Sequence, residues 1–206
     1  MAISAREGRS AAAFFEELYA IVVGLGLAFA VEQVIDLDRP VLPVRADYLP
    51  IFLAYLTLAF ALAHSSVRYL QLAYDQRGIV LDKVRVVADL FLGVGQFLLL
   101  IALSLLITRP GVFAFGAIVL LIGRPLRDLV LTLSGHDRLD LDRKVARLHI
   151  AVVLILGIAL GAGQLVPART EDLVLKVATL AASLGFGLGL YIGAFDFFFP
   201  RENEAS

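Results

Sequence analysis

Charged side chains are absent from six long stretches of the chain and are concentrated in the short segments between them. The uncharged stretches are residues 18–31, 49–67, 90–108, 111–123, 149–166 and 177–195. A helix needs about 20 mostly apolar residues to cross the ~30 Å hydrocarbon core of a bilayer, and in lipid its backbone groups must bond within the segment. The pattern therefore predicts six membrane-spanning helices, at about 14–35, 49–67, 88–108, 111–131, 149–166 and 173–199.

The fourth stretch, residues 111–123, is short for a span, because its 13 residues cover only about 20 Å as a helix. Two solutions are open: the helix crosses a thinned region with little tilt, or it continues through Arg124 and Pro125 towards Leu133. Arginines at that end could extend to the headgroups. Before this stretch, the Pro110-Gly111 pair predicts a tight turn between the third and fourth helices.

Composition agrees with a protein that is embedded in lipid over most of its length. Apolar residues make up 60% of the chain, charged residues 18%, and the mean hydropathy is +0.87, whereas soluble domains have roughly 45–50% apolar and about 25% charged residues. The sequence predicts an all-α integral membrane protein, a single six-transmembrane-helix bundle over residues 1–206, in contact with the lipid bilayer. Its first residues lack the pattern of a cleavable secretory signal, so we expect the first span to be retained.

Basic residues are distributed unevenly between the two sides of the predicted bundle. The N-terminal segment, the loops around 68–85 and 124–147, and the C-terminal tail carry 13 of the 18 Lys and Arg residues, whereas the alternate loops carry four. Loops with an excess of Lys and Arg stay on the cytoplasmic side. We therefore expect a multi-pass protein of the cell (inner) membrane with both termini in the cytoplasm, and a polar, solvated loop at residues 134–144.

No complete catalytic or metal-binding motif is present in the sequence. The chain has no cysteine, which excludes disulfides and thiolate chemistry. No pair of its three histidines has metal-ligand spacing. Glu16-Glu17 with His64 superficially resembles the glutamate pair and histidine of membrane prenyl endopeptidases, but the further histidine and arginine of such a site are not at suitable positions. We expect no enzyme activity, no metal and no cofactor, and the net charge of -1 gives no general attraction to nucleic acid.

Five carboxylates lie within or beside the predicted spans, namely Glu16, Glu17, Glu32, Asp89 and Asp196. All are within a turn or two of a predicted helix end, so we expect them to be solvated at the membrane interface. Asp89 follows Arg85 at a spacing of four residues, and Asp128 follows Arg124 at the same spacing. This spacing predicts local ion pairs at the cytoplasmic edge.

Small residues recur every four positions in three of the predicted helices. They are Ala20, Gly24 and Ala28 in the first helix, Gly157 and Gly161 in the fifth, and Ala181, Gly185, Gly189 and Gly193 in the sixth. Such a stripe lets another helix backbone approach closely. Either packing within the bundle or a contact between subunits accounts for the stripes, and we expect Gly185, Gly189 and Gly193 to pack against another helix.

The start of the first helix, Phe-Phe-Glu-Glu-Leu-Tyr-Ala-Ile from Phe14, resembles the first helix of the transmembrane protein 175 family, the bacterial and lysosomal potassium channels. That helix opens with Phe-Ser-Asp and continues with an apolar run containing Ala-Ile and Thr-Leu-Leu. Aligning Glu16 with the family aspartate places Phe14 on the phenylalanine, Ile21 on the isoleucine and Gly24 on the threonine. His64 corresponds to a histidine in the second helix. The similarity covers about fifteen residues of 206, and Phe15 stands in place of the family serine.

The resemblance implies a homotetrameric cation channel that conducts K+ through a pore lined by the first helices. Ile21 would form the narrow apolar constriction with Gly24 beside it, and Phe14, Glu16 and His64 would form the motif network. A pore can gate by such a constriction when it dewets, without a charged filter. An isoleucine in a span is otherwise an ordinary packed or lipid-facing side chain.

Three functions are therefore open for this predicted bundle. The first is a potassium-permeable cation channel and homo-oligomer. The second is a non-transporting membrane scaffold or effector subunit, which needs only the packing stripes. The third is a carboxylate-dependent secondary transporter, for which residues 123–125 are the candidate helix break.

Overall fold

The computed structural model describes residues 5–36, 44–75, 83–133 and 140–193, and this part of the chain is built from helices. One isolated antiparallel bridge joins Ile35 to Val44. The six α-helices are α1 (Ala5–Val34), α2 (Leu49–Asp75), α3 (Lys83–Ser104), α4 (Pro110–Leu133), α5 (Asp140–Gly163) and α6 (Ala168–Gly193), and a 3-10 turn, η1 (Ala46–Tyr48), precedes α2.

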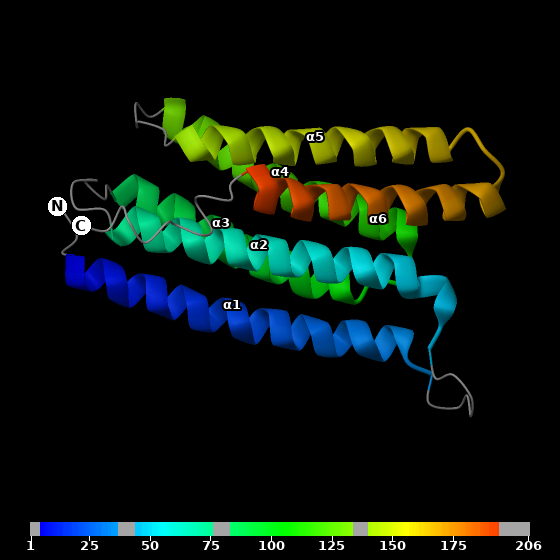
Figure 1. Ribbon diagram of the computed structural model, residues 1–206, viewed down its shortest axis with the longest axis horizontal. Helices are drawn as coiled ribbons and strands as arrows, with labels where there is room; N and C mark the ends of the chain where they lie inside the picture. Colours follow the sequence, from blue (N-terminus) through cyan, green and yellow to red (C-terminus); the bar gives the residue numbers. More distant parts are fainter. Residues whose placement is uncertain (1–4, 37–43, 76–82, 134–139, 194–206) are drawn as a thin grey trace.

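The six helices pack side by side as one bundle with two layers (Figure 1). Helices α1, α2, α6 and α5 lie next to one another in that order, and α3 and α4 pack behind them. Helix α3 contacts α1 and α4, and α4 contacts α5, so the helices form a closed ring of neighbours. Neighbouring helices alternate in direction, so α6 runs back towards the end of the bundle where α1 begins (Figure 1).

Four helical segments are long and apolar enough to cross a membrane: Glu16–Val34, Ala46–Val67, Val145–Gly163 and Thr170–Ile192. Two shorter apolar segments, Phe91–Ser104 and Pro110–Leu126, belong to α3 and α4. Large apolar side chains such as Ile21, Phe60 and Ile158 are exposed on the outside of the bundle. An apolar surface of this kind fits lipid rather than water, so the chain is an all-helical protein of the membrane-embedded class.

Several helices extend beyond the predicted spans at one end of the bundle. Helix α1 begins nine residues before residue 14, and α2 continues to Asp75, eight residues beyond residue 67. Helix α2 is therefore longer than the predicted second span, residues 49–67, and His64 lies well inside it. Helix α5 begins at Asp140, so residues 140–144 of the predicted polar loop are helical, whereas residues 134–139 lie outside the described residues.

Helix α4 is continuous through Pro125 to Leu133, which is the longer of the two solutions that the sequence left open. Its first residue is Pro110. Proline is common at the first position of a helix, because an N–H group there would have no partner within the helix. The expectation that Arg124 extends to the headgroups is wrong, because this side chain is only 4% exposed and lies inside the bundle. The acidic partners expected in the local ion pairs, Asp89 and Asp128, lie outside the described side chains, and so does Asp196.

Within one copy of the chain, the small-residue stripes are exposed over most of their length. Added Cβ atoms at Gly24, Gly157, Gly161 or Gly185 would meet nothing within 4 Å. In α6 the close approach to α2 instead occurs at Gly187, where a Cβ atom would lie 2.9 Å from the Thr57 methyl group.

Of the three predicted packing glycines of α6, Gly189 does meet another helix, because a Cβ atom there would lie 2.8 Å from the Leu148 side chain of α5. Gly185 is exposed, and no other helix of the same chain lies within 4 Å of a Cβ atom placed there. The surroundings of Gly193 lie outside the described residues. Gly189 therefore packs within the bundle, whereas a contact of Gly185 with a second subunit stays a prediction.

Candidate functional site

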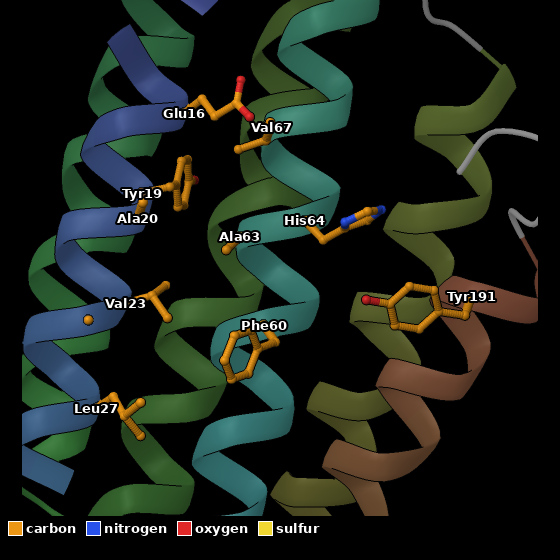
Figure 2. A pocket seen from close by; sticks show the side chains of 11 residues that line it. Glu16, Tyr19, Ala20, Val23, Leu27, Phe60, Ala63, His64, Val67 and Tyr191 are labelled. Atoms are coloured by element: carbon orange, nitrogen blue, oxygen red, sulfur yellow. The ribbon is translucent and has the colours of Figure 1, made fainter. Parts of the chain in front are cut away.

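A groove with a volume of about 550 Å³ runs along the outside of the bundle between α1 and α2 (Figure 2). Its lining side chains come mainly from these two helices, with one from α6: Glu16, Tyr19, Ala20, Val23, Gly24, Leu27, Phe60, Ala63, His64, Val67 and Tyr191. On α1 they recur at spacings of three and four residues, so they share one face of the helix. The groove is therefore a consequence of small side chains at Ala20, Gly24 and Ala63 between two adjacent helices.

The charged end of the groove is the end where α1 begins. Glu16 lies next to Val67 at that end, whereas Val23, Leu27 and Phe60 continue the groove towards the middle of the bundle (Figure 2). His64 of α2 and Tyr191 of α6 lie lower, on the side of α2 away from α1, with their ring centroids 5.7 Å apart. Among the described lining residues, Glu16 is the only charged side chain. The groove thus combines a polar, acidic end with an apolar length.

A buried hydrogen-bond network holds α1 against α2 and α3 behind this groove. The Tyr19 hydroxyl donates to Gln96 Oε1 at 2.7 Å, and the Ser66 hydroxyl approaches the same oxygen at 3.4 Å. The Tyr19 ring packs edge-on against Phe97, with centroids 4.5 Å apart. Each of the three helices supplies one polar group, so the network fixes the position of the groove wall.

A second face of α1 is uncovered and lies beside the groove. Glu17, Ile21, Gly24, Ala28 and Glu32 are exposed and recur at spacings of three and four residues, so they form one stripe along the helix. Ile21 is 65% exposed. The opposite face of α1, with Tyr19, Val22 and Ala30, is buried against α2 and α3.

The structure brings together some, but not all, of the residues that the sequence singled out. Glu16, Gly24 and His64 line the same groove. Phe14 and Ile21 do not line it, and both are exposed on the surface of α1. Gln96 was not foreseen, although an amide side chain inside the uncharged stretch 90–108 is a signal that could have found it.

A further buried polar cluster lies between α4, α5 and α6. His149 is fully buried, its Nδ1 is 2.8 Å from the Val145 carbonyl oxygen, and its ring meets Phe186 edge-on. Arg124 is near enough for its charge to act on the imidazole. His149 is the first residue of the predicted fifth span, and it lies in the core because α5 begins nine residues before it.

Among the described residues, no group of three or more His, Asp or Glu side chains could hold a metal ion. What the geometry offers is an uncovered helix face and a groove open to the surroundings of the bundle.

The fold and these two surfaces define the class: an all-helical bundle with an apolar exterior, a lateral groove and an uncovered first helix. Comparison with protein-family models, with curated protein sequences and with solved structures gave no match.

Proposed function

We propose that this protein is a six-span potassium-permeable channel of the cell membrane, assembled as a homo-oligomer in which the uncovered face of α1 lines a shared pore. Both termini lie in the cytoplasm in this proposal, as the distribution of basic residues indicates. The resemblance of the first helix to a family of tetrameric potassium channels gives the expected number of subunits.

The observation that carries the proposal is the stripe Glu17, Ile21, Gly24, Ala28 and Glu32 on the exposed face of α1. It has a carboxylate towards each end and small or apolar residues between them. In an oligomer with α1 at the axis, the two glutamates would form acidic rings near the two mouths. Rings of carboxylates favour cations in a pore, and an apolar ring between them excludes water when it is narrow.

The depth of the two carboxylates favours a hydrated pore over lipid around this face. Glu17 and Glu32 are 15 residues apart, or about 22 Å along the helix. Both therefore fall within a hydrocarbon core of ~30 Å when α1 is centred in it. A carboxylate that faces lipid at this depth is costly, whereas a water-filled pore keeps it solvated.

The small residues of the stripe support the same arrangement. Gly24 leaves open space around its Cα atom, and Ala28 is exposed. Helices with small residues on one face can approach a common axis closely. Ile21 would then be the largest side chain near the narrowest part of the pore.

The experiment is K+ flux into proteoliposomes, with wild type compared with Ile21→Asn. We expect wild type to conduct above empty liposomes and Ile21→Asn to conduct more, because an amide ring hydrates the constriction. Ile150→Asn is the matched control, since Ile150 on α5 is also exposed and lies equally far from the start of its apolar segment.

The proposal fails if folded wild type and Ile21→Asn both show only the leak of empty liposomes. It fails equally if the protein is a monomer in detergent and in lipid, because one copy of α1 cannot enclose a pore. A non-transporting scaffold or effector subunit would then be the better description. Equal gains of flux in Ile21→Asn and Ile150→Asn would show a nonspecific leak.

A further inference from the structure

We propose that the groove between α1 and α2 binds a membrane phospholipid with a primary amine headgroup, of the phosphatidylethanolamine type. The amine lies at the Glu16 end and an acyl chain lies along the apolar length of the groove. This inference requires that the bundle is embedded in lipid, but it does not depend on ion conduction.

The groove lies at the right depth and has the right shape for such a lipid. Glu16 is the first residue of the apolar segment Glu16–Val34 of α1, so it lies near the level of the headgroups. The groove then follows Val23 and Leu27 towards the middle of the membrane. A lipid that enters from the bilayer needs no passage through the protein, because the groove is on the outside of the bundle.

The groove has room for an acyl chain because some of its lining residues have small side chains, not because the backbones of α1 and α2 are far apart. Ala20 on α1 and Ala63 on α2 line the groove with single methyl groups. Phe60 forms part of the opposite wall and is 54% exposed, so its ring is available to an acyl chain. The apolar side chains of the groove that contact a bound acyl chain take the place of the neighbouring lipids that surround an acyl chain elsewhere on the bundle surface.

The headgroup is assigned from charge and from hydrogen-bonding capacity. Among the described lining residues, Glu16 is the one charged side chain, and it is an anion. A primary ammonium group offers three N–H donors to a carboxylate, whereas the quaternary ammonium of phosphatidylcholine offers none. His64, which lies between Val67 and Phe60 along the groove, can donate a hydrogen bond to the phosphate, whereas Tyr191 lies deeper, level with Val23 (Figure 2).

A helix from a second copy of the protein fits this groove less well than a lipid does. Glu16 is exposed, and an apolar helix over the groove would bury part of this charged side chain against apolar atoms, which is unfavourable. The groove also combines a polar end with an apolar length, which is the pattern of an amphiphile.

The absence of tryptophan from the chain allows a direct test with brominated lipids, which quench tryptophan fluorescence on contact. Phe60→Trp places the only tryptophan in the groove. Phe115→Trp on α4 is the matched control, because Phe115 is similarly exposed, at 61%. Both variants are reconstituted in liposomes with either brominated phosphatidylethanolamine or brominated phosphatidylcholine at equal fractions.

We expect a tryptophan at position 60 to report about a fivefold preference for phosphatidylethanolamine, and one at position 115 to report none. Adding Glu16→Gln should abolish the preference, while adding Glu17→Gln, the neighbouring carboxylate outside the groove, should leave it unchanged. Equal quenching by both lipids at position 60 overturns the proposal. Loss of quenching by both lipids there, with normal quenching at position 115, shows that protein covers the groove and overturns it too.

A second measurement requires no tryptophan. Native mass spectrometry of wild type, Glu16→Gln and Glu17→Gln from an equimolar mixture of the two lipids should show phosphatidylethanolamine retained by wild type and Glu17→Gln only. Equal retention of both lipids by wild type overturns the proposal. Because neither readout measures flux, failure of the channel proposal and failure of lipid binding are distinguishable.

Discussion

Gly26 on α1 lies directly against the hydroxyl group of Tyr55 on α2, and a Cβ atom at residue 26 would overlap that oxygen. The Leu100 carbonyl oxygen of α3 lies 3.9 Å from the same point. Tyr55 is 1% exposed and is among the largest fully buried side chains. Three helices therefore meet around a single glycine, which sets the distance between α1 and α2 near the middle of the bundle.

The first prediction is that Gly26→Ala destabilises the bundle by about 1–3 kcal/mol, the usual cost of overpacking a close-packed site. The gain in helix propensity, up to about 1 kcal/mol, offsets part of this cost. Thermal unfolding in detergent measures the change. Tyr55→Phe removes the overlapping oxygen, so the same alanine substitution should cost less in that background.

Gly24→Ala is the matched control for this prediction, because the same helix has open space two residues earlier. It should be neutral or slightly stabilising. Similar losses of stability for Gly24→Ala and Gly26→Ala would show that helix α1 is not packed as described.

The second prediction concerns the network of Tyr19, Ser66 and Gln96. Tyr19→Phe keeps the ring contact with Phe97 but removes the 2.7 Å hydrogen bond to the buried Gln96 amide. We expect a loss of about 0.5–1.5 kcal/mol. Ser66→Ala should cost less, because its approach to the same oxygen is longer, at 3.4 Å.

Combining Tyr19→Phe with Gln96→Leu gives the check on this network. In the Gln96→Leu background the acceptor is gone, so Tyr19→Phe should then cost little. Additive losses of stability in the double variant would contradict the direct hydrogen bond.

The all-helical fold and the approximate places of the helices could be predicted from the sequence, because a lipid-embedded helix must be apolar over a fixed length. In the described residues, four helical segments reach that length, and the apolar segments of α3 and α4 are shorter. The residues at which the helices begin and end could not be predicted, because helical structure continues from the apolar segments into the polar residues beside them. For this reason α5 includes residues 140–144, and His149, farther along the same helix, is buried in the core.

Which face of each helix packs inward could not be predicted either. In α6 the packed Gly187 and the open Gly185 are two residues apart and have the same side chain. A membrane helix is apolar all round, so hydrophobic periodicity carries little information about its inner face. For the candidate site, the sequence singled out three of the lining residues, Glu16 and Gly24 on α1 and His64 on α2, but the groove itself depends on how α1 lies against α2.

The third prediction is the orientation of the bundle. The native chain has no cysteine, so a single introduced cysteine reports its own side of the membrane. In intact cells, Thr170→Cys, which is exposed at the start of α6, should react with an impermeant maleimide from outside. Ser134→Cys, outside the described residues, should react only after lysis. The reverse pattern would contradict cytoplasmic termini.

The last prediction concerns the acidic stripe on α1, and it rests on the proposed channel. Carboxylates at the mouths of a pore raise the local concentration of cations, and this effect weakens over a Debye length of about 10 Å at 0.1 M salt. Glu17→Gln together with Glu32→Gln should therefore lower K+ flux by at least about twofold at low salt and by less at high salt. Asp47→Asn is the control, because it removes an exposed carboxylate that lies outside α1, in η1 before α2.

A uniform fall in flux at every salt concentration would show a structural effect of the double substitution. Unchanged flux at low salt would show that this face of α1 does not line the conducting path, even if the protein conducts.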